Sequence, residues 1–123
     1  MSRPELAEAL RRAGARFAFL HGSRTTGTAT ERSDLDVAAW WGVDNPPGSW
    51  EVVLGSGVDL LVLDDAPLWL AGRVAQHGRL LFDDDPAERV RWQAETRLMF
   101  LDQVALREAT VADYLAAVAD GRR

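Results

Sequence analysis

Apolar residues recur along the chain with spacings that predict a helix at each end and short strands between them. Leu6 and Leu10 follow helical spacing after Pro4, which predicts an opening helix, and Gly14 offers a stop. The apolar run 16–20 predicts a first buried strand. The next strand is expected over 34–41, where acidic and apolar residues alternate before the run becomes wholly apolar.

The middle of the chain is punctuated by turn residues and short apolar runs. In chain order we expect a turn over 42–48, a segment over 49–54 that fits a helical turn or a strand, a strand over 57–63, a helix over 67–76 and a short strand over 79–82. Asp64 and Asp65 are expected to cap the 67–76 helix, which Gly78 closes.

The last expected element is a long helix that Asp85 and Pro86 begin. Its helical pattern continues through Leu106, with an expected break before Tyr114. The acidic cluster 83–85 serves as its cap, since carboxylates are favoured at helix N-termini. Because this pattern is apolar on more than one side, the helix is expected to pack on the sheet and leave a stripe for a partner protein.

The order of elements is helix, strand, strand, strand, helix, strand, helix, which predicts a single α/β domain over residues 1–123. The 123 residues are 47% hydrophobic and 27% charged, as in ordinary soluble globular proteins. Cysteine is absent and no apolar run is long enough for a signal peptide or a membrane span, so a cytoplasmic protein is expected. A net charge of −5 argues against long nucleic acid as the main partner.

The segment from Gly22 to Asp36 combines a candidate phosphate site with a candidate metal site. Gly22 and Ser23 follow a strand, where a tight turn brings backbone N–H groups and the Ser23 hydroxyl towards anionic oxygens. Asp34 and Asp36 are two residues apart, so on a strand their carboxylates project to the same face. Carboxylates in this arrangement suit one or two Mg²⁺ ions, which prefer oxygen ligands.

Asp59 is the third candidate ligand, from a neighbouring strand. A charge inside an apolar strand is costly unless a metal or a partner compensates it, so Asp59 is expected to complete a three-carboxylate site. The structural alternatives are a plain turn at the Gly-Ser pair, a solvated edge or loop cap at Asp34 and Asp36, and a satisfied structural Asp59.

The spacing of Gly22-Ser23, ten residues and Asp34-Leu35-Asp36 resembles the signature of the nucleotidyltransferase superfamily that includes DNA polymerase beta and kanamycin nucleotidyltransferase. The stretches 58–61 and 67–82 extend the resemblance to the minimal MNT branch of that superfamily. It implies a polymerase-beta-like fold, with a small mixed β-sheet flanked by helices, that lacks a separate substrate domain.

The resemblance also implies roles for the candidate residues. Gly22 and Ser23 would contact the β- and γ-phosphates of a nucleoside triphosphate, Asp34 and Asp36 would bind two Mg²⁺ ions, and Asp59 would bind one ion and accept the proton of the attacking hydroxyl. Arg24 would neutralise the departing pyrophosphate or serve as an ordinary surface residue. Similar proteins act as antitoxins that transfer AMP from ATP to a tyrosine of a helical HEPN-domain toxin, so the expected activity is protein adenylylation.

Two other functions remain open from the sequence. One is a small-molecule nucleotidyltransferase of the kind that modifies aminoglycosides, and the other is a non-catalytic module that masks a partner by binding. His21 and His77 are far apart in sequence and are expected to be structural, not zinc ligands. The residues Trp40, Trp41, Trp69 and Trp92 are expected to pack in the core.

Overall fold

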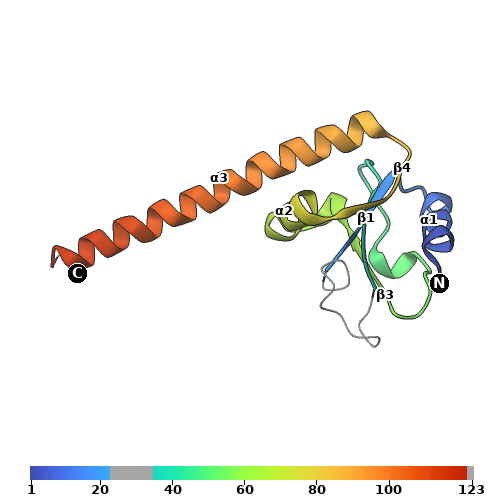
Figure 1. Cartoon of the computed structure of the whole chain (residues 1–123), viewed down its shortest axis with the longest axis horizontal. Helices are drawn as coiled ribbons and strands as arrows, with labels where there is room; N and C mark the ends of the chain where they lie inside the picture. The colour runs from blue at the N-terminus through green and yellow to red at the C-terminus, as the bar shows by residue number, and fades with distance from the viewer. Residues whose placement is uncertain (23–34, 122–123) are drawn as a thin grey trace.

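The computed structural model describes residues 1–22 and 35–121, and its four strands form one sheet in the order β3-β2-β1-β4 (Figure 1). The strands are β1 (Phe17–His21), β2 (Leu35–Trp40), β3 (Val58–Val62) and β4 (Arg79–Asp83). β1 pairs antiparallel with both β2 and β4, whereas β2 and β3 run parallel. The small mixed sheet that the family resemblance implies is therefore confirmed.

Three α-helices cover this sheet: α1 (Arg3–Arg12), α2 (Leu68–His77) and α3 (Pro86–Ala119). Single 3₁₀ turns, η1 (Ser49–Glu51) and η2 (Leu63–Asp65), precede and follow β3. The ambiguous 49–54 segment is therefore a helical turn in its first half and irregular in its second. Within the described residues no helix is both long and apolar enough to cross a bilayer.

The sheet has a buried core on each face, because successive side chains of a strand point to opposite sides. Ala18 and Leu20 of β1 belong to one cluster, together with Leu6 and Leu10 of α1. The alternate residues Phe17 and Phe19 join a second cluster with Val74 of α2 and Trp92 of α3. This two-sided burial explains why β1 is a continuous apolar run, and it places α1 on one face and α2 on the other.

α1 is stabilised at its start by a reciprocal capping box. The Ser2 hydroxyl accepts a hydrogen bond from the Glu5 amide at 3.2 Å, and the Glu5 carboxylate accepts one from the Ser2 amide at 3.4 Å. The Ser2 side chain and, to a smaller extent, the Ser2 backbone amide lower the pKa of Glu5, because both stabilise its charged carboxylate. The buried residues Leu6 and Leu10 then fix this helix on the sheet, as the spacing predicts.

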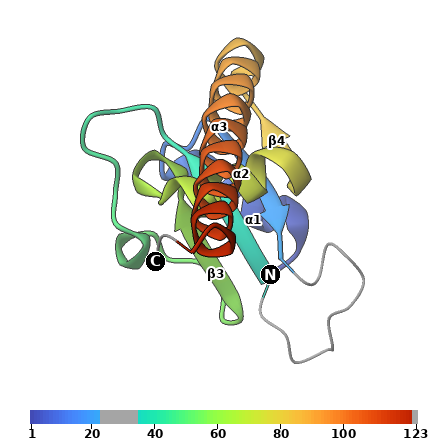
Figure 2. The same cartoon turned by 90° about the vertical axis from the view of Figure 1, so that its left-hand side faces the viewer.

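α3 is an outer layer that crosses α2 and continues well beyond it as an arm (Figures 1 and 2). Its 34 residues correspond to about 50 Å of helix. The expected break before Tyr114 is wrong, since neither proline nor glycine occurs in the chain between Pro86 and Gly121 to interrupt the helix. From residue 101 to 121 every side chain except Ala117 is exposed.

The expected capping of α2 by Asp64 and Asp65 is also wrong. η2 occupies these residues, and α2 begins after Pro67 without a side-chain cap. The Asp64 carboxylate instead accepts hydrogen bonds from the backbone amides of Trp41 at 2.9 Å and Gly42 at 2.7 Å. Asp64 therefore secures the turn after β2.

Of the three acidic residues before α3, which were expected to cap it, one does so. Asp85 is the N-cap and accepts a hydrogen bond from the Glu88 amide at 3.4 Å. Asp83 forms an ion pair with Arg89 at 2.9 Å, and Asp84 forms one with Arg11 of α1 at 2.8 Å. The last contact joins the start of α3 to the opposite side of the sheet.

The expectation that four tryptophans pack in the core holds for three of them. Trp41 is buried, while Trp40 stacks on Phe17 with ring centroids 5.0 Å apart and Trp92 lies 5.8 Å from the same ring. Trp69 is 57% exposed, and the buried residues of α2 are instead Ala71, Gly72, Val74 and Ala75. Its place in the core is therefore a wrong prediction.

Candidate active site

Two of the predicted acidic residues are brought together by strand pairing. In the parallel pair of β2 and β3, Asp36 lies opposite Asp59, so both side chains leave the same face of the sheet. This is the face that carries α2, because Ala38 and Leu61, two residues further along their strands, pack in the cluster around Val74. Two carboxylates from different strands thus share one location.

The expected burial of Asp59 is wrong. β3 is an edge strand, and Asp59 is exposed, whereas Val62 at the end of the same strand is buried. The energetic argument from a buried charge therefore does not apply to Asp59. Its position in register with Asp36 is the observation that retains it as a candidate ligand.

Gly22 lies directly after β1 and touches the same site. Its φ of +88° is in the left-handed region that favours glycine. A Cβ at residue 22 would collide with the Asp36 carboxylate, with the Cγ atom of Asp36 only 3.0 Å away. Glycine is thus required here for two independent reasons, and the close approach of backbone to carboxylate matches the predicted tight turn.

The predicted residues Ser23, Arg24 and Asp34 lie outside the described residues. In the described part of the chain no three Asp, Glu, His or Cys residues cluster as a metal site. Asp36 and Asp59 nevertheless offer oxygen donors of the kind that Mg²⁺ prefers, side by side at the end of the sheet. The residues present therefore fit a hard divalent cation, and the three-carboxylate site stays a prediction.

His21, which is expected from the sequence to be structural, lies beside this site. It ends β1 opposite Asp36, and its Nε2 atom is buried without a hydrogen-bond partner among the described residues. Burial lowers the pKa of His21, and the charge of Arg73 on α2 acts in the same direction, whereas Asp36 raises it. The ring is therefore mainly neutral at pH 7.

The sequence held a signal for this contact. His21 directly precedes the turn, so once β1 and β2 pair antiparallel it must share a face with the acidic start of β2. Strand order was the missing information, because the same element order permits other pairings. Arg73 was missed for a similar reason, since nothing in the sequence places α2 over this face.

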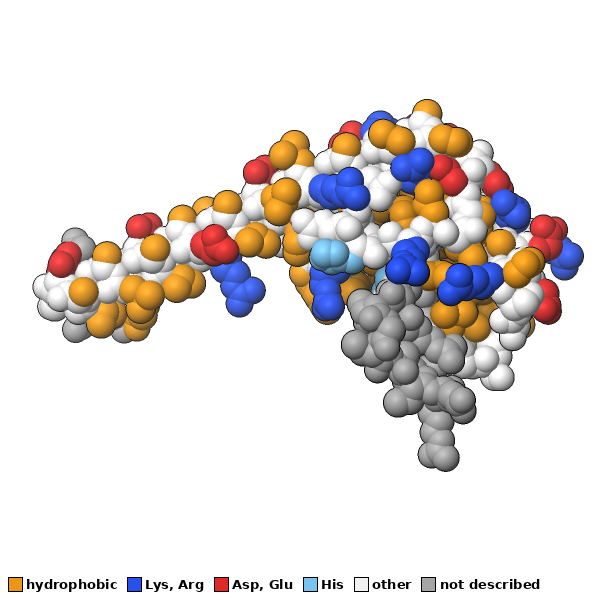
Figure 3. All heavy atoms as spheres, viewed as in Figure 1, with side chains coloured by type: hydrophobic (Ala, Val, Ile, Leu, Met, Phe, Trp, Pro, Cys, Tyr) orange, Lys and Arg blue, Asp and Glu red, His pale blue; other side chains and the backbone are white. Residues whose placement is uncertain are grey.

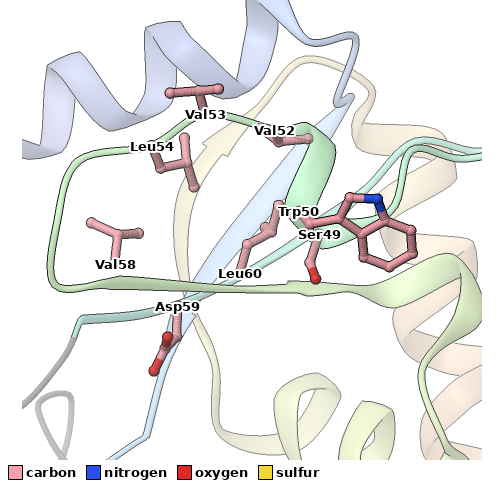
Figure 4. Close-up of a pocket in the computed structure, with 8 residues that line it drawn as sticks. All are labelled: Ser49, Trp50, Val52, Val53, Leu54, Val58, Asp59 and Leu60. Carbon is pink, nitrogen blue, oxygen red and sulfur yellow. The ribbon is translucent and has the colours of Figure 1, made fainter.

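A hollow of about 470 Å³ lies between β3 and the 49–54 segment, and Asp59 is among the residues that line it. Figure 4 shows that Val58 and Leu60 point into it, whereas the Asp59 carboxylate points away on the opposite side of β3. Val58 and Leu60 both pack against the core cluster on the α1 side of the sheet. The hollow therefore does not face the carboxylate pair.

Comparison with known families decides the class of the protein. Residues 5–87 match the family model described as Polymerase beta, Nucleotidyltransferase. The chain belongs to this nucleotidyltransferase family. The match begins inside α1, contains the whole sheet and α2, and ends just inside α3. No curated protein matches the chain significantly.

Solved structures of nucleotidyltransferase relatives extend the likeness to nearly the whole chain. A toxin–antitoxin complex with AMP-PNP contains a chain that is 26% identical, with a TM-score of 0.74 and coverage of 94% of this chain and 99% of that chain. The toxin–antitoxin MntA-HepT gives 24% identity, a TM-score of 0.67 and coverage of 92% and 96%.

A third structure is a tri-AMPylated Shewanella oneidensis HEPN toxin in complex with MNT antitoxin. The matching chain in it is 24% identical, with a TM-score of 0.67 and coverage of 92% of this chain and 95% of that chain. At this identity the likeness establishes the fold alone. The polymerase-beta-like nucleotidyltransferase fold and the resemblance to the minimal MNT branch are confirmed by these comparisons.

Proposed function

We propose that this nucleotidyltransferase transfers AMP from ATP to a tyrosine hydroxyl of a helical HEPN-type toxin and thereby acts as its antitoxin. The observation that carries the proposal is the opposition of Asp36 and Asp59 on adjacent strands, directly beside Gly22. The structural relatives support it, since one holds AMP-PNP and another contains a tri-AMPylated HEPN toxin. We assign the function to the whole unit 1–123, acting in the cytoplasm.

The triphosphate would be held at the turn after β1. The backbone around Gly22 and the Ser23 hydroxyl donate hydrogen bonds to the β- and γ-phosphate oxygens. Arg24 would neutralise charge on the pyrophosphate that leaves. Arg73 offers a second cation on the same face, close enough for its charge to lower the pKa of His21.

The carboxylates would organise the transfer itself. Asp34, Asp36 and Asp59 would hold two Mg²⁺ ions, whose chemistry is to stabilise negative charge on the entering and leaving oxygens. Asp59 would accept the proton of the acceptor hydroxyl while the oxygen of that hydroxyl forms a bond to the α-phosphorus. The bond from that phosphorus to the bridging oxygen breaks, and pyrophosphate departs with the electron pair.

The test is intact-mass spectrometry of a candidate HEPN-domain partner, after incubation with the enzyme, Mg²⁺ and each of the four nucleoside triphosphates. One or more AMP units are expected on the toxin with ATP. Asp36→Asn should remove this mass increase, while Asp65→Asn, a control at an exposed acid in η2, should keep it. A stable complex that gains no mass with any triphosphate would favour masking by binding alone.

A second outcome of this experiment would point to a small-molecule acceptor. In that case the triphosphate would be consumed with an aminoglycoside in the mixture, and the toxin mass would stay unchanged. This alternative requires a second wall around the acceptor, which a partner or a second copy would supply.

A further inference from the structure

Within the described residues no strand pairs with the outer edge of β3, which ends the sheet beside β2. The Leu35 amide of β2 donates a hydrogen bond to the Gly57 carbonyl oxygen at 2.7 Å, and Leu35 lies opposite Val58. In a parallel pair a residue bonds to the two residues that flank the one opposite it. Gly57 and Asp59 therefore turn their main-chain groups towards β2, whereas those of Val58 and Leu60 point outward.

The two faces of this edge strand have different surroundings. Asp59 projects on the α2 side, opposite Asp36, while Val58 and Leu60 point into the hollow of about 470 Å³ on the α1 side. Figure 4 shows β3 in front of β2, with the hollow above the strand and the Asp59 carboxylate below it. A strand added to β3 would therefore place alternate side chains in the hollow and beside the carboxylate pair.

The hollow suits an apolar side chain. Its lining residues are apolar apart from Ser49 and Asp59, and those outside β3 are Trp50, Val52, Val53 and Leu54. Trp50 is 83% exposed at one end of the hollow, and its ring lies over Gly48, where a Cβ would come within 2.5 Å of it. An exposed tryptophan held in this way offers a large contact surface to a ligand.

We propose that β3 binds the acceptor as an extended segment that adds one strand to the sheet, with the acceptor tyrosine on the Asp59 face and an apolar neighbour in the hollow. The inference rests on the proposed function for the reaction and adds how the acceptor is recognised. In recognition by strand addition, main-chain hydrogen bonds supply affinity and pockets for alternate side chains supply specificity.

The position of Asp59 selects this occupant. Hydrophobic side chains are also exposed along the α3 arm (Figure 3), but the edge of β3 carries a candidate site residue in its own strand. Gly22 and Asp36 lie on the β2 side of Asp59, so an acceptor that approaches over the outer edge meets Asp59 first. A tyrosine opposite Asp59, or two residues along, is within reach, because long side chains span diagonal positions in a sheet.

A second copy of this chain is a poorer occupant of the same edge. The strand Val58–Val62 contains no hydroxyl side chain, so a second β3 would cover Asp59 without offering it an acceptor. An acceptor segment held by its main chain, in contrast, would keep its hydroxyl in register with the carboxylates, and such positioning lowers the barrier to transfer.

The test uses peptide acceptors with the full chain, Mg²⁺ and ATP. One blocked pentapeptide has a central tyrosine, valine on both sides of it and glutamine at both ends, and a second has asparagine in place of both valines. We expect KM for the valine peptide to be about tenfold lower than KM for the asparagine peptide and for N-acetyl-tyrosinamide. Equal KM values for the two peptides would overturn the inference.

Main-chain pairing is tested by N-methylation of the valine peptide, which removes one amide donor at a time. Alternate residues of an added strand turn their amides towards β3. Methylation at the tyrosine and methylation at the following valine should therefore differ, with one raising KM about tenfold and the other changing it little. Equal effects at the two positions would overturn the strand geometry.

Trp50→Ala tests the hollow from the side of the enzyme. The variant should raise KM for the valine peptide about fivefold and leave transfer to N-acetyl-tyrosinamide unchanged. Trp69→Ala is the matched control, because Trp69 is also exposed, at 57%, and belongs to α2 on the opposite face of the sheet. An unchanged KM in Trp50→Ala, or an equal rise in Trp69→Ala, would contradict the role of the hollow.

Binding of a fluorescein-labelled valine peptide, followed by anisotropy with AMP-PNP and Mg²⁺, separates this inference from the proposed function. Binding that one N-methylation abolishes, without transfer to any acceptor, would support strand addition and refute AMP transfer. Transfer to N-acetyl-tyrosinamide with no preference among the peptides would do the reverse. A dimer of the chain that excludes the peptide, seen by light scattering, would assign the edge to a second copy and overturn the inference.

Discussion

The carboxylate of Asp36 fills the space into which any side chain at residue 22 would project. The end of β1 and the start of β2 therefore fit together only with glycine at this turn. A first prediction concerns Gly22→Ala, which adds both the collision with Asp36 and the strain of a positive φ. We expect a loss of about 1–3 kcal/mol in the free energy of unfolding and loss of AMP transfer, as Asp36 is displaced.

Gly57→Ala is the matched control for that experiment. Gly57 also has a positive φ, of +77°, but a Cβ there would meet no atom within 4 Å. Its substitution should therefore produce the strain alone, with transfer retained. Equal loss of transfer in both alanine variants, measured at a temperature where both are folded, would show that the contact with Asp36 is unimportant.

A second prediction follows from the opposition of Asp36 and Asp59. Two carboxylates opposite each other on neighbouring strands repel, so in metal-free solution Asp59→Asn should leave stability unchanged or raise it by up to about 1 kcal/mol. Mg²⁺ should raise the Tm of the unmodified chain and raise that of the variant less. The measurement is thermal unfolding in EDTA and in MgCl₂, with Asp65→Asn as the control.

A larger Mg²⁺-dependent rise of Tm in Asp59→Asn than in the unmodified chain would contradict this assignment. So would a strong loss of stability in EDTA, because it would mean that the Asp59 carboxylate is needed for the fold and not for a cation.

Asp64→Ala gives a third prediction, which concerns the framework and not the chemistry. The variant leaves the backbone amides of Trp41 and Gly42 without their acceptor, which should lower the free energy of unfolding by about 1–3 kcal/mol. Urea unfolding followed by tryptophan fluorescence measures this effect. Asp65→Ala, at an exposed neighbour, should change stability by less than about 0.5 kcal/mol; a similar loss in both would refute the role of Asp64.

The crossing of α2 and α3 provides a fourth prediction. A Cβ at Gly72 would press on the Phe100 side chain, with the Phe100 Cβ atom 2.7 Å away. Gly72→Ala should therefore destabilise the protein by about 1–3 kcal/mol through overpacking. A double-mutant cycle with Phe100→Ala should show that the two effects are not additive. Additive losses would mean that the loss in Gly72→Ala does not come from contact with Phe100.

The sequence predicts most elements because local patterns determine them. The helical spacing of Leu6 and Leu10, the apolar run of β1 and the Asp85-Pro86 start of α3 each report their own element. The order of the strands depends on pairings between distant segments, so it could not be predicted from these patterns. The errors at Asp64, Trp69 and Asp59 share that cause, since each required knowledge of which side of an element is covered.

The candidate site was predictable in its residue types and not in its surroundings. Motif spacing identified Gly22 and Asp36, and a single acid inside an apolar run identified Asp59. The register of β2 and β3 places Asp36 opposite Asp59, and Gly22 lies against the Asp36 carboxylate. His21 and Arg73 became visible only once β1 paired with β2 and α2 lay over the same face. Ser23, Arg24 and Asp34 remain predictions from the sequence.

The projecting half of α3 separates two kinds of evolutionary constraint within one small chain. Substitutions around Gly22 and Asp36 disturb the fold and the chemistry together, because backbone and carboxylate are in contact there. From Leu101 to Gly121, side chains other than Ala117 are exposed, so their substitution leaves the stability of the body nearly unchanged. Fold stability therefore places little constraint on the sequence of the arm, whereas around Asp36 the same residues serve the packing of the turn and the candidate site at once.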